Sequence, residues 1–197
     1  MNRERLEQQL AFALEIDKEK QVLRQTHLSG HSRRENDAEH AWHMTVMAYL
    51  LQEYANEPID IARTMIMTLT HDLVEIYAGD TYAYDTEGQL TAHAREVEAA
   101  DRLFGLLPPD QAAQLRAIWE EFEARETPEA RFARAMDSVQ PMMLNDSNDG
   151  ADWKARGIAR SAPASRNEVT RTGSRELAAY IDERLDAHVA AGNLRDA

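Results

Sequence analysis

The residues best suited to chemistry stand together in the stretch His71-Asp72-Leu73-Val74-Glu75, at the end of an apolar segment. Burying a histidine beside an aspartate is costly unless a partner satisfies both side chains. Because adjacent helical residues point about 100° apart, one ion lying between them can contact both. Glu75 follows His71 by four residues, which places it on the same helix face. The spacing therefore predicts a cation site with a further carboxylate within reach.

Two more polar residues interrupt apolar segments elsewhere in the chain. His40 lies within Ala38-Glu39-His40-Ala41-Trp42, and Asp137 follows Phe132-Ala133-Arg134-Ala135-Met136. Two imidazoles and two carboxylates suit a divalent ion such as Mn, Co, Fe, Ni or Zn. Taken singly, each residue has a simpler explanation: a hydrogen-bonded core histidine for His40, and a helix cap or an arginine partner for Asp137.

Helices must position these residues, because the composition favours helices over sheets. The 197 residues include only 8 Gly and 6 Pro, whereas Ala, Leu, Glu and Arg are abundant. We therefore expect an all-α, compact single-domain fold over residues 1–197, with a core at about 5–145 and a C-terminal loop and helix at 146–197 packed on it. The run at 65–70 is apolar almost all round, which predicts a central helix with neighbours on most sides.

Hydrophobic periodicity and turn residues predict the bounds of the elements. A short segment at 18–24 is expected to carry Val22 and Leu23 into the core, and Asn36 or Asp37 can cap the helix that follows. We expect helices around 6–14, from that cap to 51, from 58 to the turn at 79–80, and over 91–105, 109–125, 127–146 and 167–191. We expect loops at 26–34, 81–90 and 146–163.

The charge balance limits the partners. There are 22 Lys and Arg against 35 Asp and Glu, a net charge of −13, which disfavours binding to nucleic acid polymers. A small anionic substrate is compatible, because a metal ion and a few arginines can reverse the potential locally. The absence of cysteine excludes disulfides and thiolate metal sites. No apolar stretch is long enough for a membrane helix and no apolar signal core opens the chain, so a cytoplasmic location is expected.

Three stretches of the sequence carry a known pattern in order and spacing. They are Arg33–Trp42, His71–Thr81 and Trp119–Asp137. Together they resemble the HD-domain metal-dependent phosphohydrolase superfamily, and most closely its 5′-deoxynucleotidase branch, which includes the YfbR type and the HD-domain-containing protein 2 type. The similarity covers roughly residues 5–145. It implies a helical HD-domain fold with one divalent metal ion.

The resemblance also implies roles for single residues. The four metal ligands would be His40, His71, Asp72 and Asp137. Glu75 would activate water or protonate the leaving oxygen, and Asp80 falls where the family places an acidic residue beside the substrate. Arg24 matches the arginine that binds the substrate phosphate, but Gln25 follows it where this branch often has tryptophan.

Four residues near these motifs have less defined roles. Arg33 is predicted either to bind the substrate phosphate or to tether its loop. His43, three residues after His40, is predicted to have a structural role or to support a metal ligand. The sequence assigns no role to His27 and His31, which lie in the expected loop.

The activity implied by the resemblance is removal of phosphate from a small monophosphate, above all a nucleoside 5′-monophosphate. Two alternatives stay open. One is a hydrolase of the same superfamily that acts on a triphosphate or a phosphodiester. The other is a non-catalytic protein in which the metal is structural, although such a protein would not need Glu75. Relatives of the YfbR type are commonly dimers, so a homodimer is expected.

Overall fold

Helices make up most of the computed structural model, which describes residues 2–196 apart from the side chain of Thr86. The helices are α1 (Arg3–Glu15), α2 (Asp37–Leu51), α3 (Ile61–Thr70), α4 (Glu75–Ala78), α5 (Thr86–Phe104), α6 (Pro109–Ala124), α7 (Pro128–Ser147), α8 (Ala151–Arg156), α9 (Ser161–Gly173) and α10 (Arg175–Ala190). The remaining elements are the 3-10 helices η1 (Ile16–Gln21) and η2 (Gln52–Tyr54) and the strands β1 (Leu23–His27) and β2 (Arg34–Asn36). The predicted all-α class is confirmed.

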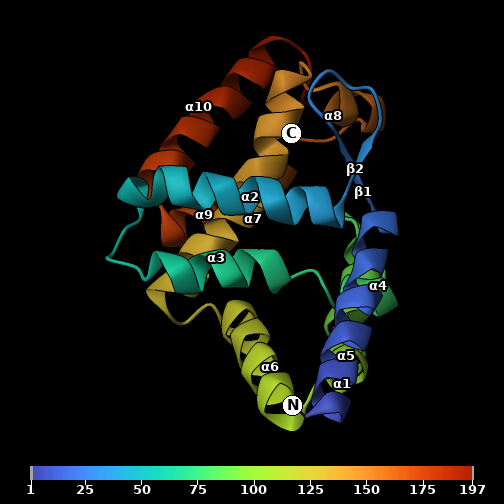
Figure 1. Ribbon diagram of the computed structural model, residues 1–197. Helices are drawn as coiled ribbons and strands as arrows, with labels where there is room; N and C mark the ends of the chain where they lie inside the picture. The colour runs from blue at the N-terminus through green and yellow to red at the C-terminus, as the bar shows by residue number, and fades with distance from the viewer. Residues whose placement is uncertain (1, 197) are drawn as a thin grey trace.

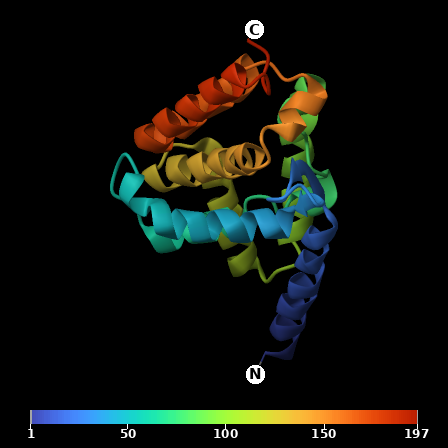
Figure 2. The ribbon, with the colours of Figure 1, turned by 90° about the horizontal axis from the view of Figure 1, so that it is seen from above.

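Helix α7 is the centre of the fold. It contacts α2, α3, α6, α9 and α10. Helix α2 crosses in front of α7 in Figure 1 and lies next to it in Figure 2. Helices α1 and α10 lie at opposite ends of the molecule in both views. Thr127 caps α7 and Pro128 opens it, as expected of a proline in the first turn. Every residue from Ala135 to Gln140 is buried, so Asp137 and Gln140 lie in the interior on a rigid support.

The helix predicted to be central is less enclosed than expected. On α3, Ile66 is 43 % exposed and Leu69 is 40 % exposed, whereas Met67 and Thr68 are buried. One face of α3 therefore reaches the surface, and the more enclosed helix is α7. The prediction failed because an apolar run in the sequence does not show which of its side chains are covered by other helices.

Helices α2 and α3 lie side by side (Figure 1). His40 in α2 and His71, the residue that follows α3, are both buried. Asn36 caps α2 by accepting a hydrogen bond from the backbone N–H of Glu39, whose side chain bonds back to the N–H of Asn36. This confirms one of the two predicted caps. Asp60 caps α3, so the helix begins at Ile61 rather than at Pro58. It ends at Thr70, and a turn separates it from α4.

The expected loop at 26–34 is confirmed over 28–33, which forms the turn of a β-hairpin whose strands take up the two ends of that range. Strands β1 and β2 are antiparallel, and the N–H of Leu28 donates to the carbonyl of Arg33 at 3.0 Å. Gly30 and His31 turn the chain with left-handed backbone angles, φ 83° and 58°. Leu23 is 54 % exposed, so the prediction that it enters the core is wrong. It opens a short strand at the surface instead.

The C-terminal part is more helical than predicted. The expected loop at 146–163 contains α8 and the start of α9. Earlier in the chain, α5 also begins sooner than expected, at Thr86 rather than near residue 91. The single helix expected at 167–191 is divided into α9 and α10 by Ser174, which caps α10 through its hydroxyl. Gly173 ends α9 where its backbone lies against α7, which leaves no room for a side chain.

Replacing Gly173 with alanine tests this packing. The φ angle of Gly173 is not left-handed, so removing glycine would by itself stabilise the fold by about 0.4–1 kcal/mol. A Cβ atom, however, would lie 2.7 Å from the carbonyl carbon of Arg131 and 2.9 Å from Cβ of Ala135. We expect Gly173→Ala to lower the free energy of unfolding by about 1–3 kcal/mol in urea denaturation. A gain in stability would contradict the close contact between α9 and α7.

Candidate metal centre and active site

A cavity of about 370 Å³ opens where the end of β1, the turn after α3, and helices α5, α7, α8 and α9 meet. His71, Asp72, Glu75 and Asp80 line one part of it, and Asp137 lies in its wall. His40 is fully buried and contacts Asp137. The structure therefore brings the four predicted metal ligands to one place, and adds Glu75 and Asp80 at the same cavity.

One ring nitrogen of His40 is held by a hydrogen bond to a residue of α7, and the other can bind a metal ion. Its Nδ1 donates to Oε1 of Gln140 at 2.9 Å. The amide of Gln140 is oriented by its Nε2, which donates to Oε1 of Glu35 at 2.6 Å. Because Nδ1 carries the proton, a neutral His40 presents a lone pair at Nε2, 3.2 Å from Oδ1 of Asp137. Two acceptors this close need a cation between them, either a proton or a metal ion.

His71 is arranged in the same way. Its Nδ1 donates to the carbonyl of Thr68 at 3.0 Å, which directs Nε2 into the site. Nε2 lies 3.0 Å from Oδ2 of Asp72 and 3.8 Å from Oδ1 of Asp137. A hydrogen bond from the second ring nitrogen to a carbonyl is the usual support of a metal-binding histidine. Both histidines therefore have the orientation that a ligand requires.

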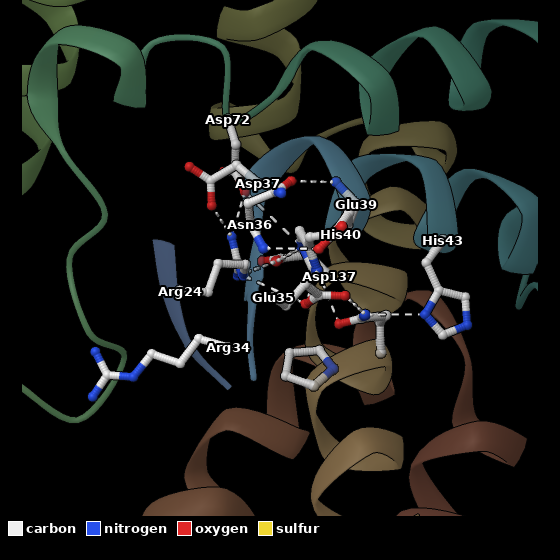
Figure 3. Close-up of polar contacts among 12 residues, drawn as sticks. Arg24, Arg34, Glu35, Asn36, Asp37, Glu39, His40, His43, Asp72 and Asp137 are labelled. Atoms are coloured by element: carbon white, nitrogen blue, oxygen red, sulfur yellow. Dashed lines mark hydrogen bonds and ion pairs between the residues drawn. The ribbon is translucent and has the colours of Figure 1, made fainter. Parts of the chain in front are cut away.

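Arg24 is surrounded by carboxylates. Its Nη1 donates to Oδ2 of Asp72 at 2.7 Å and to Oδ1 of Asp37 at 3.2 Å, as Figure 3 shows. Its Nη2 lies 4.0 Å from Oδ1 of Asp137. Arg134 and Arg166 contact Asp137 as well, but Glu75 and Asp80 add two more carboxyl groups at the same cavity. Carboxyl groups therefore outnumber the guanidinium groups beside them, which favours a further cation.

Unpartnered atoms give an independent test of whether a divalent ion fits. Among the described residues, the buried polar atoms without a hydrogen-bond partner around the site include Nε2 of His71, Oε2 of Glu35, Oδ2 of Asp37 and Oε2 of Glu75, together with Nε of Arg24. Ligand atoms of His40, His71 and Asp72 all lie within 4.8 Å of one another. Imidazole and carboxylate donors at this spacing fit a first-row divalent ion.

The pKa shifts show that burial and like charges disfavour the ionised form of several carboxyl groups at the site. Burial, with Asp72 nearby, raises the pKa of Asp37 to about 7, and burial raises the pKa of Glu35 to about 7. Burial and the charges of Asp72 and Asp37 raise the pKa of Glu75 well above its ordinary value. Against the effect of burial, His71 and Arg24 hold the pKa of Asp72 below its ordinary value. The charged form of Asp72 is thus favoured, which suits a cation ligand, whereas the surroundings of Glu75 favour its protonated form.

Asp137 is held by arginines on the side away from the histidines. Nη1 of Arg134 donates to its Oδ2 at 3.1 Å, and Nη2 of Arg166 lies 3.6 Å from the same oxygen. Burial opposes the charged form, but the contact with His40 and the charges of Arg134 and Arg166 hold the pKa of Asp137 well below its ordinary value. One oxygen therefore faces the histidines, and the other faces two arginines that line the cavity.

The other predicted residues divide between the cavity and its surroundings. Asp80 lines the cavity, whereas Arg33 pairs with Glu39 at 2.6 Å and does not line it. This arrangement favours the tethering role that was one of the two alternatives for Arg33. Nδ1 of His43 accepts from Nε2 of Gln140 at 3.1 Å, so His43 supports the glutamine that orients His40. Both His27 and His31 lie away from the metal cluster, beside Asp152.

Sequence reasoning missed several residues of the site. Gln140 follows Asp137 by three residues on α7, and this spacing was the signal that placed it on the same face. Glu35 and Asp37 belong to the polar stretch before α2 and gave no apolar context that would have marked them as buried. Arg166 comes from α9, and no local pattern links it to Asp137.

Comparison with known proteins identifies the family. The sequence model of the HD domain matches residues 16–178, so the chain belongs to the HD-domain family. It is 31 % identical over 156 residues to the 5′-deoxynucleotidase HDDC2 of Bos taurus, covering 79 % of this chain and 75 % of the relative. It is 24 % identical over 158 residues to the protein of that name from Danio rerio, covering 80 % and 78 %.

A solved structure agrees over nearly the whole chain. It is titled a predicted metal-dependent phosphohydrolase from Magnetospirillum magnetotacticum, and it shares 49 % identity with a TM-score of 0.92. The superposition covers 96 % of this chain and 95 % of that one. The resemblance inferred from the motifs and the predicted HD-domain fold are confirmed. The predicted enzyme class, a metal-dependent phosphohydrolase, agrees with what these relatives are called.

Within the described residues, no helix is both long and apolar enough to cross a membrane.

Gln140 provides a test of the metal centre that spares the predicted ligands. Replacing it with methionine removes the acceptor that fixes Nδ1 of His40 while keeping similar volume. We expect Gln140→Met to weaken Mn²⁺ or Co²⁺ binding by about 10- to 100-fold in equilibrium dialysis. Gln111→Met is the matched control, because Gln111 contacts Gln9 and does not line the cavity. Unchanged affinity in a folded Gln140→Met protein would show that Gln140 does not orient a ligand.

Proposed function

We propose that this protein is a metal-dependent phosphohydrolase that removes the phosphate of a small monophosphate, in particular a nucleoside 5′-monophosphate. The observation that carries the proposal is the convergence of four ligand-competent side chains on the cavity that also holds Glu75 and Arg24. The proposed ligands are His40, His71, Asp72 and Asp137. The names of the relatives, 5′-deoxynucleotidase and predicted metal-dependent phosphohydrolase, support the same class.

Arginines in the cavity can contact an anionic substrate, although seven carboxyl side chains line it as well. Although the chain has a net charge of −13, five arginines line this one cavity: Arg24, Arg125, Arg134, Arg156 and Arg166. Guanidinium groups recognise phosphate through paired hydrogen bonds, and they would draw the substrate to an otherwise acidic molecule. Arg24 is engaged with Asp72 and Asp37, so the more open arginines supply the remaining contacts.

An aromatic part of the cavity suits a nucleobase. Tyr82, Tyr84 and Trp153 line it, and the guanidinium of Arg156 lies over the ring of Tyr82 at 4.5 Å. Nη2 of Arg156 donates to Oε1 of Gln25 at 2.8 Å. Gln25 stands where the nucleotidase branch often has tryptophan. It has no ring to stack on a base, but it holds the guanidinium of Arg156, which can stack. A planar base fits against such a platform.

The roles of the chain's residues follow from their positions. A bound divalent ion would supply an acidic water and polarise the phosphoryl oxygens. Burial and neighbouring carboxylates raise the pKa of Glu75, which suits it to pass a proton to the leaving 5′-oxygen. Asp80, at the same cavity, is placed to accept a hydrogen bond from the sugar. Arg134 and Arg166 hold Asp137 in position.

The expected homodimer and the cytoplasmic location belong to this proposal as predictions. They rest on the resemblance and on the sequence composition, respectively.

Phosphate release is the direct test of the proposal. Protein stripped of metal and reloaded with Mn²⁺, Co²⁺, Ni²⁺, Fe²⁺ or Zn²⁺ is assayed on nucleoside 5′-monophosphates, 3′-monophosphates, triphosphates and simple esters. We expect metal-dependent release of inorganic phosphate from 5′-monophosphates and none with Asp72→Ala. Release of pyrophosphate or triphosphate would favour the other superfamily activities. No turnover with any loaded ion would favour a structural metal.

Glu75→Gln separates acid catalysis from metal binding. The amide keeps the shape of the side chain but cannot donate the acid proton, so turnover of a nucleoside 5′-monophosphate should fall by about 10²- to 10⁴-fold. Turnover of an aryl phosphate, whose leaving group needs no proton, should fall much less. Metal content, measured by mass spectrometry, should stay unchanged. If the ion is lost with the substitution, Glu75 is a ligand and the acid role is wrong.

A further inference from the structure

A second cluster of ligand-type side chains lies outside the metal centre. His27 ends β1, His31 lies in the hairpin turn, and Asp152 is in the first turn of α8. Oδ1 of Asp152 is 2.8 Å from Nδ1 of His27 and 3.1 Å from Nε2 of His31. The two imidazole rings are stacked with centroids 4.0 Å apart. The three ligand atoms all lie within 4.8 Å of one another.

The backbone around this cluster is held in place. The N–H of Gly30 donates to Oδ1 of Asn148 at 2.9 Å, and Nδ2 of Asn148 donates to the carbonyl of Leu28 at 2.9 Å. These bonds fasten the hairpin turn to the end of α7. The left-handed conformation of His31, φ 58°, turns its ring back over that of His27. A non-glycine residue in this conformation is uncommon and indicates a constraint at the site.

Asp152 is also oriented before any ligand binds. Its Oδ2 accepts the backbone N–H of His27 at 3.2 Å, which leaves Oδ1 directed at both rings. Ligand atoms about 2.0–2.1 Å from one ion, at the angles of a tetrahedral or octahedral site, lie roughly 2.9–3.4 Å apart. The two nitrogen–oxygen distances therefore need to change by only a few tenths of an ångström. His31 is 43 % exposed and His27 is 24 % exposed, so an ion can enter from solvent.

From this geometry we propose that His27, His31 and Asp152 form an accessory site for a divalent transition-metal ion. Two imidazoles and one carboxylate suit Zn²⁺, Ni²⁺ or Cu²⁺ better than Mg²⁺ or Ca²⁺, which prefer oxygen ligands. Three protein ligands leave a coordination position for water. The site is distinct from the metal centre, with which it shares no residue.

The accessory ion would join two walls of the substrate cavity. Asp152 lines the cavity, as does Arg156 one helical turn further along α8. His27 lies on β1 three residues after Arg24, which reaches the metal centre. An ion bound between β1 and α8 therefore fixes the spacing of the two elements that carry Arg24 and Arg156. This makes the accessory site a structural clip beside the cavity.

Counting bound ions tests the accessory site without an activity assay. Metal-stripped protein is equilibrated with micromolar Zn²⁺ in millimolar Mg²⁺, and the zinc bound per chain is measured by mass spectrometry. His31→Asn removes one imidazole, while asparagine tolerates the left-handed conformation. We expect His31→Asn to bind one Zn²⁺ fewer per chain than the unaltered protein. This difference does not depend on whether the metal centre itself takes zinc.

Ser32→Asn is the matched control, because it places the same side chain at the next, exposed position. It should keep the full zinc count, and circular dichroism should show that both variants are folded. Zinc should also shift the ring signals of His27 and His31 in the unaltered protein by nuclear magnetic resonance. Equal zinc counts in the unaltered protein and His31→Asn, or an equal loss in both variants, would overturn the proposal.

Discussion

The rest of the structure depends on a surplus of negative charge buried at the junction of α2, α3 and α7. Asp72, Asp137 and Asp37 surround Arg24, and Asp137 also contacts Arg134 and Arg166. Asp72 and Asp137 in addition lie next to imidazole nitrogens that point into the site. Such an arrangement is costly without a compensating cation. In the metal-free protein, protons occupy part of it. A divalent ion would remove the cost in one step.

The fold provides the rigidity that this arrangement requires. Helix α7 is enclosed on most sides, so Asp137 and Gln140 have fixed positions relative to α2. The carbonyl of Thr68 and the amide of Gln140 each hold the outer nitrogen of a histidine. The ligands are thus oriented by contacts formed on folding.

The sequence predicts the parts of this structure that rest on local signals. Proline and capping residues locate α6 and α7 to within a residue or two, and the order of the motifs places His40 and Asp137 at one site. Features set by distant contacts were missed. The break after Gly173 depends on its contact with α7, and the hairpin depends on pairing across a turn with two left-handed residues. Arg156 reaches the cavity only through packing of α8, which no periodicity in the polar stretch predicts.

Anomalous X-ray diffraction from crystals of the manganese-loaded protein tests the central claim most directly. The buried cluster should hold one strong anomalous peak, about 2.0–2.2 Å from Nε2 of both histidines and from the carboxylates of Asp72 and Asp137. Such a peak would establish that the buried charge is balanced by a metal ion. The account would be contradicted if the protein were fully loaded with manganese, the peak lay elsewhere, and the four side chains were joined to one another only by hydrogen bonds.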